Sequence, residues 1–233
     1  MVRKADNAAE KPGNTLQTLD RGLQALSVIA GQPEGISVAA LAARLEVHRA
    51  IAYRLATTLE MHGLIARDAA GALHLGAGIL TLASRFGPQL RARAQPLLQE
   101  LAGRSGAAAF LSVAQGEECV AVAVAEPEGR LLHIAYRVGN RHPLSRGAAG
   151  IAILAGRPEG AGDTDAVREA RRSGVSITRS ELQRGAVGVA SPIPGLPGFE
   201  ASLGVVALDD LDVDRASAWV TDCARRLGQA VAG

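Results

Sequence analysis

Apolar and polar positions alternate along the first third of the chain with the period of an α-helix. One stripe is formed by residues three or four positions apart: Leu16, Leu19, Leu23, Leu26 and Ile29. Pro33 ends this pattern, because proline lacks the amide proton that a continuing helix needs. A first helix is therefore expected to begin near Thr15.

Two further helical patterns follow. Ser37 is placed to cap a helix over Val38–Leu45, since a serine oxygen accepts a hydrogen bond from a free amide in the first turn. After a tight turn, a third helix is predicted from His48 to His62. Glu46 lies in this turn, where glycine is common because φ is positive, and glutamate costs about 1 kcal/mol in that conformation.

A short hairpin and a linker complete this part of the chain. Leu64–Ala66 and Leu73–Leu75 are apolar runs on either side of a polar turn, which is the pattern of two paired strands. A hairpin directly after three helices is typical of a winged helix-turn-helix. Residues 77–86 predict a short linker helix.

The second and third helices have complementary faces. Apolar residues recur at helical spacing on the sides that face each other: Leu41, Ala42, Leu45, Val47, Ala52, Leu55 and Leu59. The opposite face of the third helix carries donors for phosphate oxygens and base edges in the major groove. With the cap and the wing, the residues predicted to bind double-stranded DNA are Ser37, His48, Arg49, Ala50, Ile51, Tyr53, Arg54, Thr57, Arg67 and His74.

A three-helix bundle with a solvated polar face is the alternative interpretation. Glu46 favours it slightly, but a bundle has no need of a wing on which Arg67 and His74 can reach the DNA backbone. Charge does not decide between the two, because residues 1–76 hold eight lysines and arginines against seven acidic residues. The faces of the helices and the wing favour DNA.

Beyond Gly103 the pattern changes to short apolar runs between helical segments. We expect an α+β domain with an antiparallel sheet and helices beside it. A helix over Leu90–Arg104 turns Leu97, Leu98 and Leu101 inward. The elements expected after it are strands at Ala107–Val113, Glu118–Ala125 and Leu131–Tyr136, helices at Ala148–Leu154 and Asp165–Ser173, strands at Gly188–Ile193 and Ala201–Leu208, and a helix over Asp212–Val231.

Composition adds limits rather than a function. A chain of 233 residues suits two domains, and no window approaches the roughly 18 apolar residues of a membrane span. Residues 1–14 are polar and are expected to form a disordered arm without a secretion signal, so a cytoplasmic protein is expected. Cys119 and Cys223 are far apart and are interpreted as buried small apolar residues.

Enzymes are a remote alternative. The sequence contains no GxSxG elbow, P-loop, HExxH, or GxGxxG after a strand. Gly76 and Gly78 are interpreted as a helix start, Glu117 and Glu118 as an exposed turn, and His142 as a loop residue. No catalytic residue, metal site or cofactor is predicted.

Several segments resemble the IclR family of bacterial transcriptional regulators. They are Tyr53-Arg54-Leu55, Leu59 with His62-Gly63, Leu75-Gly76, Val138 to Leu144, and Gly174 through Gly185 to Ala190-Ser191-Pro192. The resemblance implies a winged helix-turn-helix at 15–76, a linker helix at 77–89, and a GAF-like effector-binding and oligomerisation domain at 90–233. It also implies homodimers, often paired into tetramers, on a palindromic operator. Ala50-Ile51 stands where the family usually has Ser-Thr, so the operator sequence does not transfer.

The resemblance also implies an effector pocket. Positions that make polar contacts in some members match Gly188, Gly204 and Val206, so we expect a small-sided apolar pocket. Its expected ligand is an aromatic or largely apolar metabolite that controls operator binding by a repressor, with Arg137, Arg141 or Arg179 as a counter-charge. A second domain that only oligomerises is the alternative. The predicted effector-binding residues are Leu111, Val113, Arg137, Leu144, Ala148, Ala149, Arg179, Gly188, Gly204 and Val206.

Overall fold

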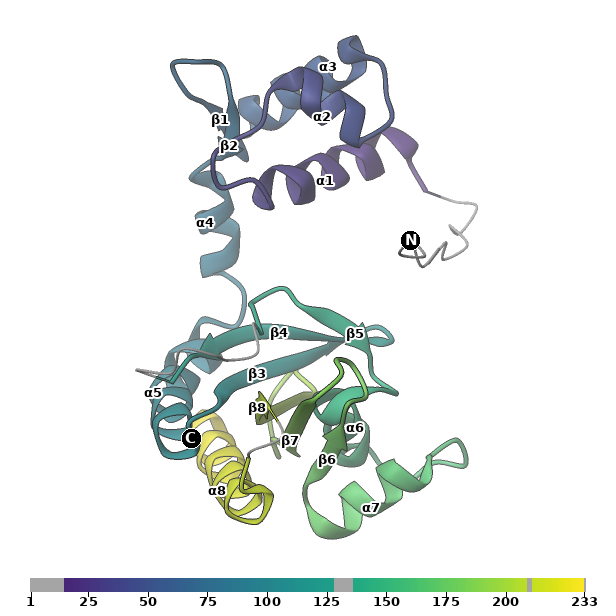
Figure 1. Cartoon of the computed structure of the whole chain (residues 1–233), viewed down its shortest axis with the longest axis vertical. Helices are drawn as coiled ribbons and strands as arrows, with labels where there is room; N and C mark the ends of the chain where they lie inside the picture. The colour runs from purple at the N-terminus through teal and green to yellow at the C-terminus, as the bar shows by residue number, and fades with distance from the viewer. Residues whose placement is uncertain (1–14, 128–135, 209–210, 233) are drawn as a thin grey trace. The chain divides into compact units, whose positions relative to one another are not determined.

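The structure is a computed structural model that describes residues 15–127, 136–208 and 211–232. It divides into two compact units, the first ending at Phe86 and the second beginning at Gly87 (Figure 1). The arm predicted at 1–14, His133, and the strand expected at Leu131–Tyr136 except for Tyr136 itself lie outside these ranges. No helix within them is both long enough and apolar enough to cross a membrane.

The first unit is a winged helix-turn-helix, as predicted. Its helices and strands lie within about two residues of the expected bounds. A single apolar cluster joins all three helices to the hairpin through Ile29, Leu41, Leu59 and Leu73. The elements are α1 (Gln17–Ala30), α2 (Val38–Arg44), α3 (Arg49–Met61), β1 (Ile65–Arg67), β2 (Leu73–Leu75) and the linker helix α4 (Gly78–Ser84).

The turn between α2 and α3 has the geometry expected for it. Ser37 caps α2 by accepting a hydrogen bond from the Ala40 amide at 3.2 Å. At the other end, the Val47 amide bonds to the Ala42 carbonyl at 3.0 Å and closes a Schellman motif. Glu46 occupies the left-handed position of this motif with φ of 53°, which glycine would adopt without strain.

The base of the wing holds the start of α4. The Gly76 amide bonds to the Leu64 carbonyl, and the Gly78 amide bonds to the Gly63 carbonyl, both at 2.9 Å. A Cβ at Gly76 or Gly78 would lie 2.2 or 2.7 Å from the Gly63 oxygen. These two positions therefore need glycine because the backbones approach so closely, and Gly78 begins a helix as predicted.

The apolar stripe of α1 is largely uncovered. Leu16, Leu19 and Leu23 are 76%, 59% and 56% exposed, whereas Ile29 at the other end of the helix is buried. These leucines line an apolar groove of about 630 Å³ together with Leu55 and other residues of α3. Helical periodicity correctly predicted the stripe, but only its C-terminal end belongs to the core of this unit.

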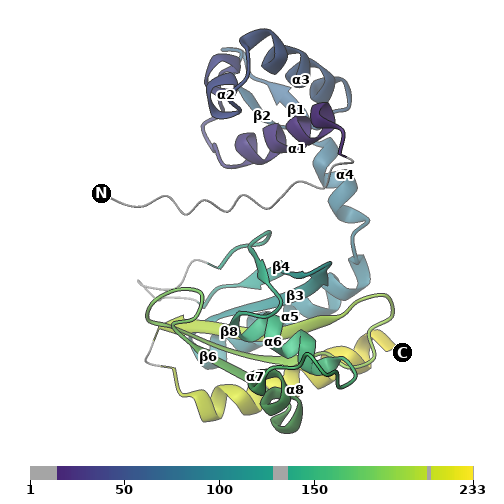
Figure 2. The ribbon, with the colours of Figure 1, turned by 90° about the vertical axis from the view of Figure 1, so that its right-hand side faces the viewer.

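The second unit is an α+β domain (Figure 2). It has one antiparallel sheet of six strands in the order β5-β4-β3-β8-β7-β6 (Figure 1). Its fold class agrees with the prediction. The elements are α5 (Pro88–Ser105), β3 (Ala108–Gln115), β4 (Glu118–Ala125), β5 (Arg141–Pro143), α6 (Gly147–Gly156), α7 (Asp165–Ser173), β6 (Ser176–Arg179), β7 (Ala186–Pro192), β8 (Ala201–Leu208) and α8 (Val213–Ala232).

The two edge strands were not predicted. β5 contains His142, which was wrongly interpreted as a loop residue and instead pairs with Cys119 of β4. β6 pairs with β7 through Ser176 to Arg179. Both strands are shorter than the run of alternating residues that distinguishes a strand from a loop, so tertiary pairing decides their conformation.

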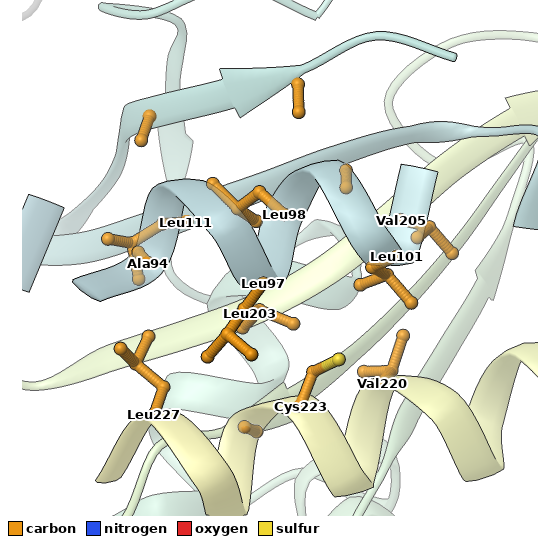
Figure 3. Packing of buried hydrophobic residues seen from close by; sticks show 14 of the residues in the cluster. Ala94, Leu97, Leu98, Leu101, Leu111, Leu203, Val205, Val220, Cys223 and Leu227 are labelled. Carbon is orange, nitrogen blue, oxygen red and sulfur yellow. The ribbon is translucent and has the colours of Figure 1, made fainter. Parts of the chain in front are cut away.

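One face of the sheet is filled by α5 and α8. Figure 3 shows Leu97, Leu98 and Leu101 of α5 next to Val220, Cys223 and Leu227 of α8, with Leu203 and Val205 of β8 beneath them. Cys119 and Cys223 are both buried, as predicted. This face forms the main core of the unit, which we call the filled face.

The opposite face of the sheet packs against α6. Here Phe110 of β3 and Leu144 contact the alanine-rich side of α6. Gly150 lets α6 approach closely, since a Cβ there would lie 2.5 Å from the Leu144 carbonyl oxygen. We call this side, with Phe110, Ser112, Gly204 and Val206 on its strands, the α6 face.

Candidate functional sites

The outward face of α3 is exposed over its first two turns. His48, Arg49, Ala50 and Arg54 are exposed, and Ile51 and Tyr53 are 38% and 56% exposed. Thr57, one turn further on, is half-buried. The opposite side of α3 is buried against the core through Ala52, Leu55, Ala56 and Leu59. The predicted recognition face is thus brought together on one side of one helix.

Two arginines on this face lack partners. Within the described residues, neither Arg49 nor Arg54 makes an ion pair or a side-chain hydrogen bond. An unpaired cation on an exposed helix can neutralise a phosphate and release its counterions. Arg49 follows the N-cap of α3 directly, and Arg54 lies five residues later. Together they form the positive part of a candidate nucleic-acid interface.

Arg67 is placed differently from what the sequence indicated. Its Nε donates to Glu60 Oε2 at 2.9 Å, and its guanidinium lies 5.5 Å from the ring centroid of Tyr53. The guanidinium of Arg67 therefore packs on the Tyr53 ring, and the Glu60 carboxylate partly balances its charge. Contact with DNA would require Arg67 to share or exchange this carboxylate.

His74 and Ser37 have structural partners as well. His74 Nε2 lies 3.2 Å from Asp68 Oδ2, and its ring fills the space that a Cβ on Gly35 would need. The Ala72 amide and His74 lower the pKa of Asp68, which remains ionised. Ser37 Oγ is engaged at the α2 cap. Both residues support the conformation of the interface and are exposed or half-buried at its border.

A small cavity lies between the α6 face of the sheet and α6. Its volume is about 40 Å³. Phe110 and Tyr136 pack against each other at its apolar wall, with ring centroids 4.8 Å apart and planes tilted by 43°. The lining residues are Phe110, Tyr136, His142, Ala148, Ala149, Thr178, Glu181, Leu182, Ala186, Gly188 and Val206.

Four of the ten predicted effector residues line this cavity, namely Ala148, Ala149, Gly188 and Val206. Leu144 belongs to the core beside it, and the space that a side chain on Gly204 would need is occupied by the Phe110 ring, 2.7 Å from an added Cβ. Leu111 and Val113 lie on the filled face instead. Successive strand residues point to opposite sides, so their neighbours Phe110 and Ser112 lie on the α6 face, and Phe110 lines the cavity.

The arginines expected to provide a counter-charge lie outside the cavity. Arg141 donates to Glu118 and to Gln115, both at 2.9 Å. Arg137 and Arg179 are exposed. No lysine or arginine is among the described residues that line the cavity, and Glu181 is the one acidic residue in that lining.

Three buried polar atoms lack a hydrogen-bond partner within the described residues: Ser112 Oγ, Tyr136 Oη and His142 Nε2. Burial raises the pKa of Tyr136 and of Cys119 to about 12, and the neighbouring Ser112 hydroxyl opposes part of both shifts. The Tyr136 hydroxyl therefore stays protonated at neutral pH. Sequence reasoning missed all three atoms; strand alternation could have found Ser112, whereas Tyr136 and His142 depend on tertiary packing.

Nothing in the described ranges suggests a metal centre, because no three His, Cys, Asp or Glu residues there are grouped to hold an ion. The site consists instead of an exposed cationic helix in one unit and a small buried cavity in the other.

Sequence comparison assigns both units to the same family. The model of the IclR helix-turn-helix domain matches residues 18–69, and that of the bacterial transcriptional regulator IclR C-terminal domain matches residues 87–163. Together they span more than half of the chain. Both describe transcriptional regulators rather than enzymes, in agreement with the missing catalytic motifs.

Similar proteins agree with this assignment. An HTH-type transcriptional regulator of Mycobacterium tuberculosis is 31% identical over 144 residues, or 61% of this chain and 55% of that protein. The glycerol operon regulatory protein of Streptomyces griseus is 30% identical over 148 residues, or 61% of this chain and 57% of that protein. The matched region thus spans little more than half the length of these curated relatives.

The fold also matches solved structures. An IclR homologue from Microbacterium hydrocarbonoxydans, complexed with 4-hydroxybenzoate, has a TM-score of 0.77 at 19% identity and covers 92% of this chain and 98% of its own. With matching domain models over both units and the same fold, the chain belongs to the IclR family of bacterial transcriptional regulators.

Proposed function

We propose that this regulator represses transcription by binding an operator through α3 and that a small aromatic or largely apolar molecule controls the binding. Residues 15–76 would bind DNA, 77–89 would link the domains, and 90–233 would bind the effector and oligomerise. The observation that carries the DNA-binding proposal is the exposed face of α3, where Arg49 and Arg54 have no ion-pair partner among the described residues.

Arginine substitutions test the DNA interface. Arg54→Ala should weaken binding to operator and to nonspecific DNA alike and lower the salt dependence, because a phosphate contact is lost. Arg49→Ala should relax preference at one or two base pairs. Gel shifts at several salt concentrations, on a duplex selected from random DNA by the wild-type protein, would measure both effects. Arg172→Ala, on the exposed side of α7, is the matched control, and wild-type binding by both test variants would contradict the proposal.

We propose that the operator-bound form is a homodimer or a pair of homodimers. The apolar groove along α1 supports this. Leu16, Leu19 and Leu23 are exposed on one face of the helix, and such an apolar patch is uncommon on a monomer surface. Leu19→Asp should shift full-length protein towards a smaller assembly in sedimentation equilibrium, whereas Val138→Asp, at an equally exposed site of the second unit, should not. An unchanged association state in Leu19→Asp would exclude this groove as the interface.

The effector proposal rests on the cavity under α6. Two aromatic rings in contact and four small residues of α6 and β7 form its wall, which suits a flat apolar molecule. The 4-hydroxybenzoate complex of the Microbacterium hydrocarbonoxydans homologue supports a ligand role for this fold. Operator release by candidate metabolites in gel shifts would test the control of DNA binding.

The cavity volume favours a second candidate, a regulator whose second domain only oligomerises. At about 40 Å³ the cavity is far smaller than the cavity of roughly 150 Å³ that admits benzene in a well-studied case. Thermal-shift screening separates the candidates, because a ligand of the native state raises Tm by mass action. A broad aromatic library without any shift would support oligomerisation alone.

A further inference from the structure

The three unpartnered polar atoms on the α6 face lie where an effector would bind, and their chemistry limits what that effector can be. This inference rests on the proposed effector role of the cavity. Buried polar atoms without partners are rare in native proteins, and those at a cavity commonly bond to a ligand or to ordered water. Tyr136 and His142 both line the cavity, and Ser112 is fully buried beside Tyr136.

The tautomer of the neutral His142 ring follows from the contact of its other nitrogen. Nδ1 lies 3.0 Å from the Pro143 carbonyl oxygen, which can only accept a hydrogen bond. The proton of the neutral ring therefore lies on Nδ1, and Nε2 presents a lone pair. A group that satisfies Nε2 must donate a hydrogen bond.

Tyr136 requires a hydrogen-bond acceptor on the ligand. Its hydroxyl is protonated and can donate to a ligand oxygen, while the nearby Ser112 hydroxyl can rotate to donate or accept. A hydroxyl group on the ligand can both accept a hydrogen bond, as Tyr136 requires, and donate one, as His142 requires. A carboxylate only accepts, so it would leave the His142 lone pair facing an anion.

The charges around the cavity agree with an uncharged ligand. Glu181 lines it, and Arg146 Nη2 donates to the Glu181 backbone oxygen, which leaves the carboxylate of Glu181 without the arginine. The α6 N-terminus also reaches the cavity through Ala148, but the Ala148 amide already donates to Thr178 Oγ1 at 3.1 Å. A buried carboxylate is best stabilised by a cation, and no lysine or arginine is among the described residues that line the cavity.

Leu182 determines how such a ligand would enter. It is 47% exposed, and an added Cβ on Gly147 would lie 2.4 Å from its Cδ1, so its side chain rests on the start of α6 beside His142. A single ring needs more than the present volume, and rotation of this exposed side chain would enlarge the cavity towards solvent. Outward rotation of the exposed Leu182 side chain is therefore the movement that would admit a ring.

We propose that the effector is an uncharged, single-ring molecule with a hydroxyl group that bonds to Tyr136 and His142, and that Tyr136 determines specificity for this hydroxyl over a carboxylate or a methyl group. Tyr136 acts by direct contact.

Phenol, toluene and benzoate test this, because they share a ring and differ in one substituent. Isothermal titration of the full-length chain should give at least about tenfold tighter binding for phenol than for toluene or benzoate, as expected for a buried hydrogen bond. Tyr136→Phe should weaken phenol binding by about tenfold and leave toluene binding unchanged. Ser217→Ala, which removes a hydroxyl of α8 outside the cavity lining, should change neither.

The outcomes separate this inference from the proposed function. Benzoate binding tightest, an unchanged ratio of phenol to toluene affinity in Tyr136→Phe, or no binding of any of the three rings would overturn the inference. The phenylalanine keeps the ring packed against Phe110, so a folded variant is expected, and an unchanged Tm verifies it. Operator release is measured in parallel: release only by a carboxylate that binds independently of Tyr136 would retain effector control and refute the hydroxyl specificity. Tyr136-dependent phenol binding without release of DNA would retain the hydroxyl specificity and refute effector control of DNA binding.

Discussion

The two faces of the six-stranded sheet differ in how adjacent residues of the same strands are packed. Leu111 and Leu203 point to the filled face, where α5 and α8 leave them fully buried in apolar contacts. Ser112 and Gly204, the next residues along, point to the α6 face, beside a cavity and unpartnered polar atoms. One face provides stability, and the other retains space and polar groups that stability alone would not select.

Two serines on neighbouring strands of the α6 face differ in their hydrogen bonding. Ser112 of β3 and Ser202 of β8 are directly opposite each other, and both are fully buried. Ser202 donates to the Ala149 carbonyl at 2.9 Å and ties the sheet to α6. Ser112 has no such bond. The same residue type thus anchors a helix at one position and remains available at the other.

Leu203→Ala should have the largest effect on stability. It removes a fully buried side chain from the filled face and should lower the free energy of unfolding by about 3 kcal/mol, because the surrounding core cannot close the cavity. Val206→Ala on the α6 face should cost only about 1 kcal/mol. Urea unfolding measures both, and equal losses would contradict the distinction between the faces.

Gly204→Ala should cause the second-largest loss of stability. Its Cβ would lie 2.4 Å from the Val189 oxygen and 2.7 Å from Phe110 Cζ, so the strand or the ring must move, at a cost of about 2 kcal/mol. Gly188→Ala is the matched control on β7, where an added Cβ meets Ala148 Cβ at 3.1 Å and Thr178 Oγ1 at 3.2 Å. A control that destabilises as much as Gly204→Ala would show that the α6 face has no spare room.

Alkaline pH should have the third-largest effect, because it lowers the free energy of unfolding through two buried groups of the α6 face. Burial raises the pKa of Tyr136 from 10.0 to about 12, so its contribution to stability is complete below pH 10 and is lost as the pH rises towards 12. Tyr136→Phe should remove up to one proton from the slope of unfolding free energy in this window. Cys119→Ala should do the same from pH 9 upward, since burial raises the thiol pKa from 9.0 to about 12. A slope unaffected by both substitutions would show that neither group is desolvated.

The serine pair should give the smallest and most specific effect. Ser202→Ala breaks a buried hydrogen bond and should cost about 1 kcal/mol, whereas Ser112→Ala removes an unpartnered hydroxyl and should change stability by roughly zero. Thermal unfolding of the two variants side by side measures the difference. A larger loss in Ser112→Ala would mean that its hydroxyl bonds to an ordered water.

Periodicity predicted most helices and long strands of this fold, because each has enough residues to show one apolar face. Glu46 was recognised as a strained turn residue from its position alone. The cavity was harder to predict, since Leu111 and Phe110 are equally apolar and only the packing of α6 decides which side is hollow. His142 was missed because a three-residue edge strand carries no periodic pattern, and Tyr136 because only tertiary packing brings it to the cavity.

The glycines at the base of the wing limit how this protein can be engineered. Biosensors are often built by fusing the DNA-binding part of one regulator to the sensing part of another. Because Gly76 and Gly78 pack directly on the Gly63 carbonyl, a junction placed there would import foreign side chains into a backbone contact with no space for them. A chimera that keeps α4 intact and joins the parts at Phe86 or Gly87 would preserve this contact and leave the recognition helix in its native setting.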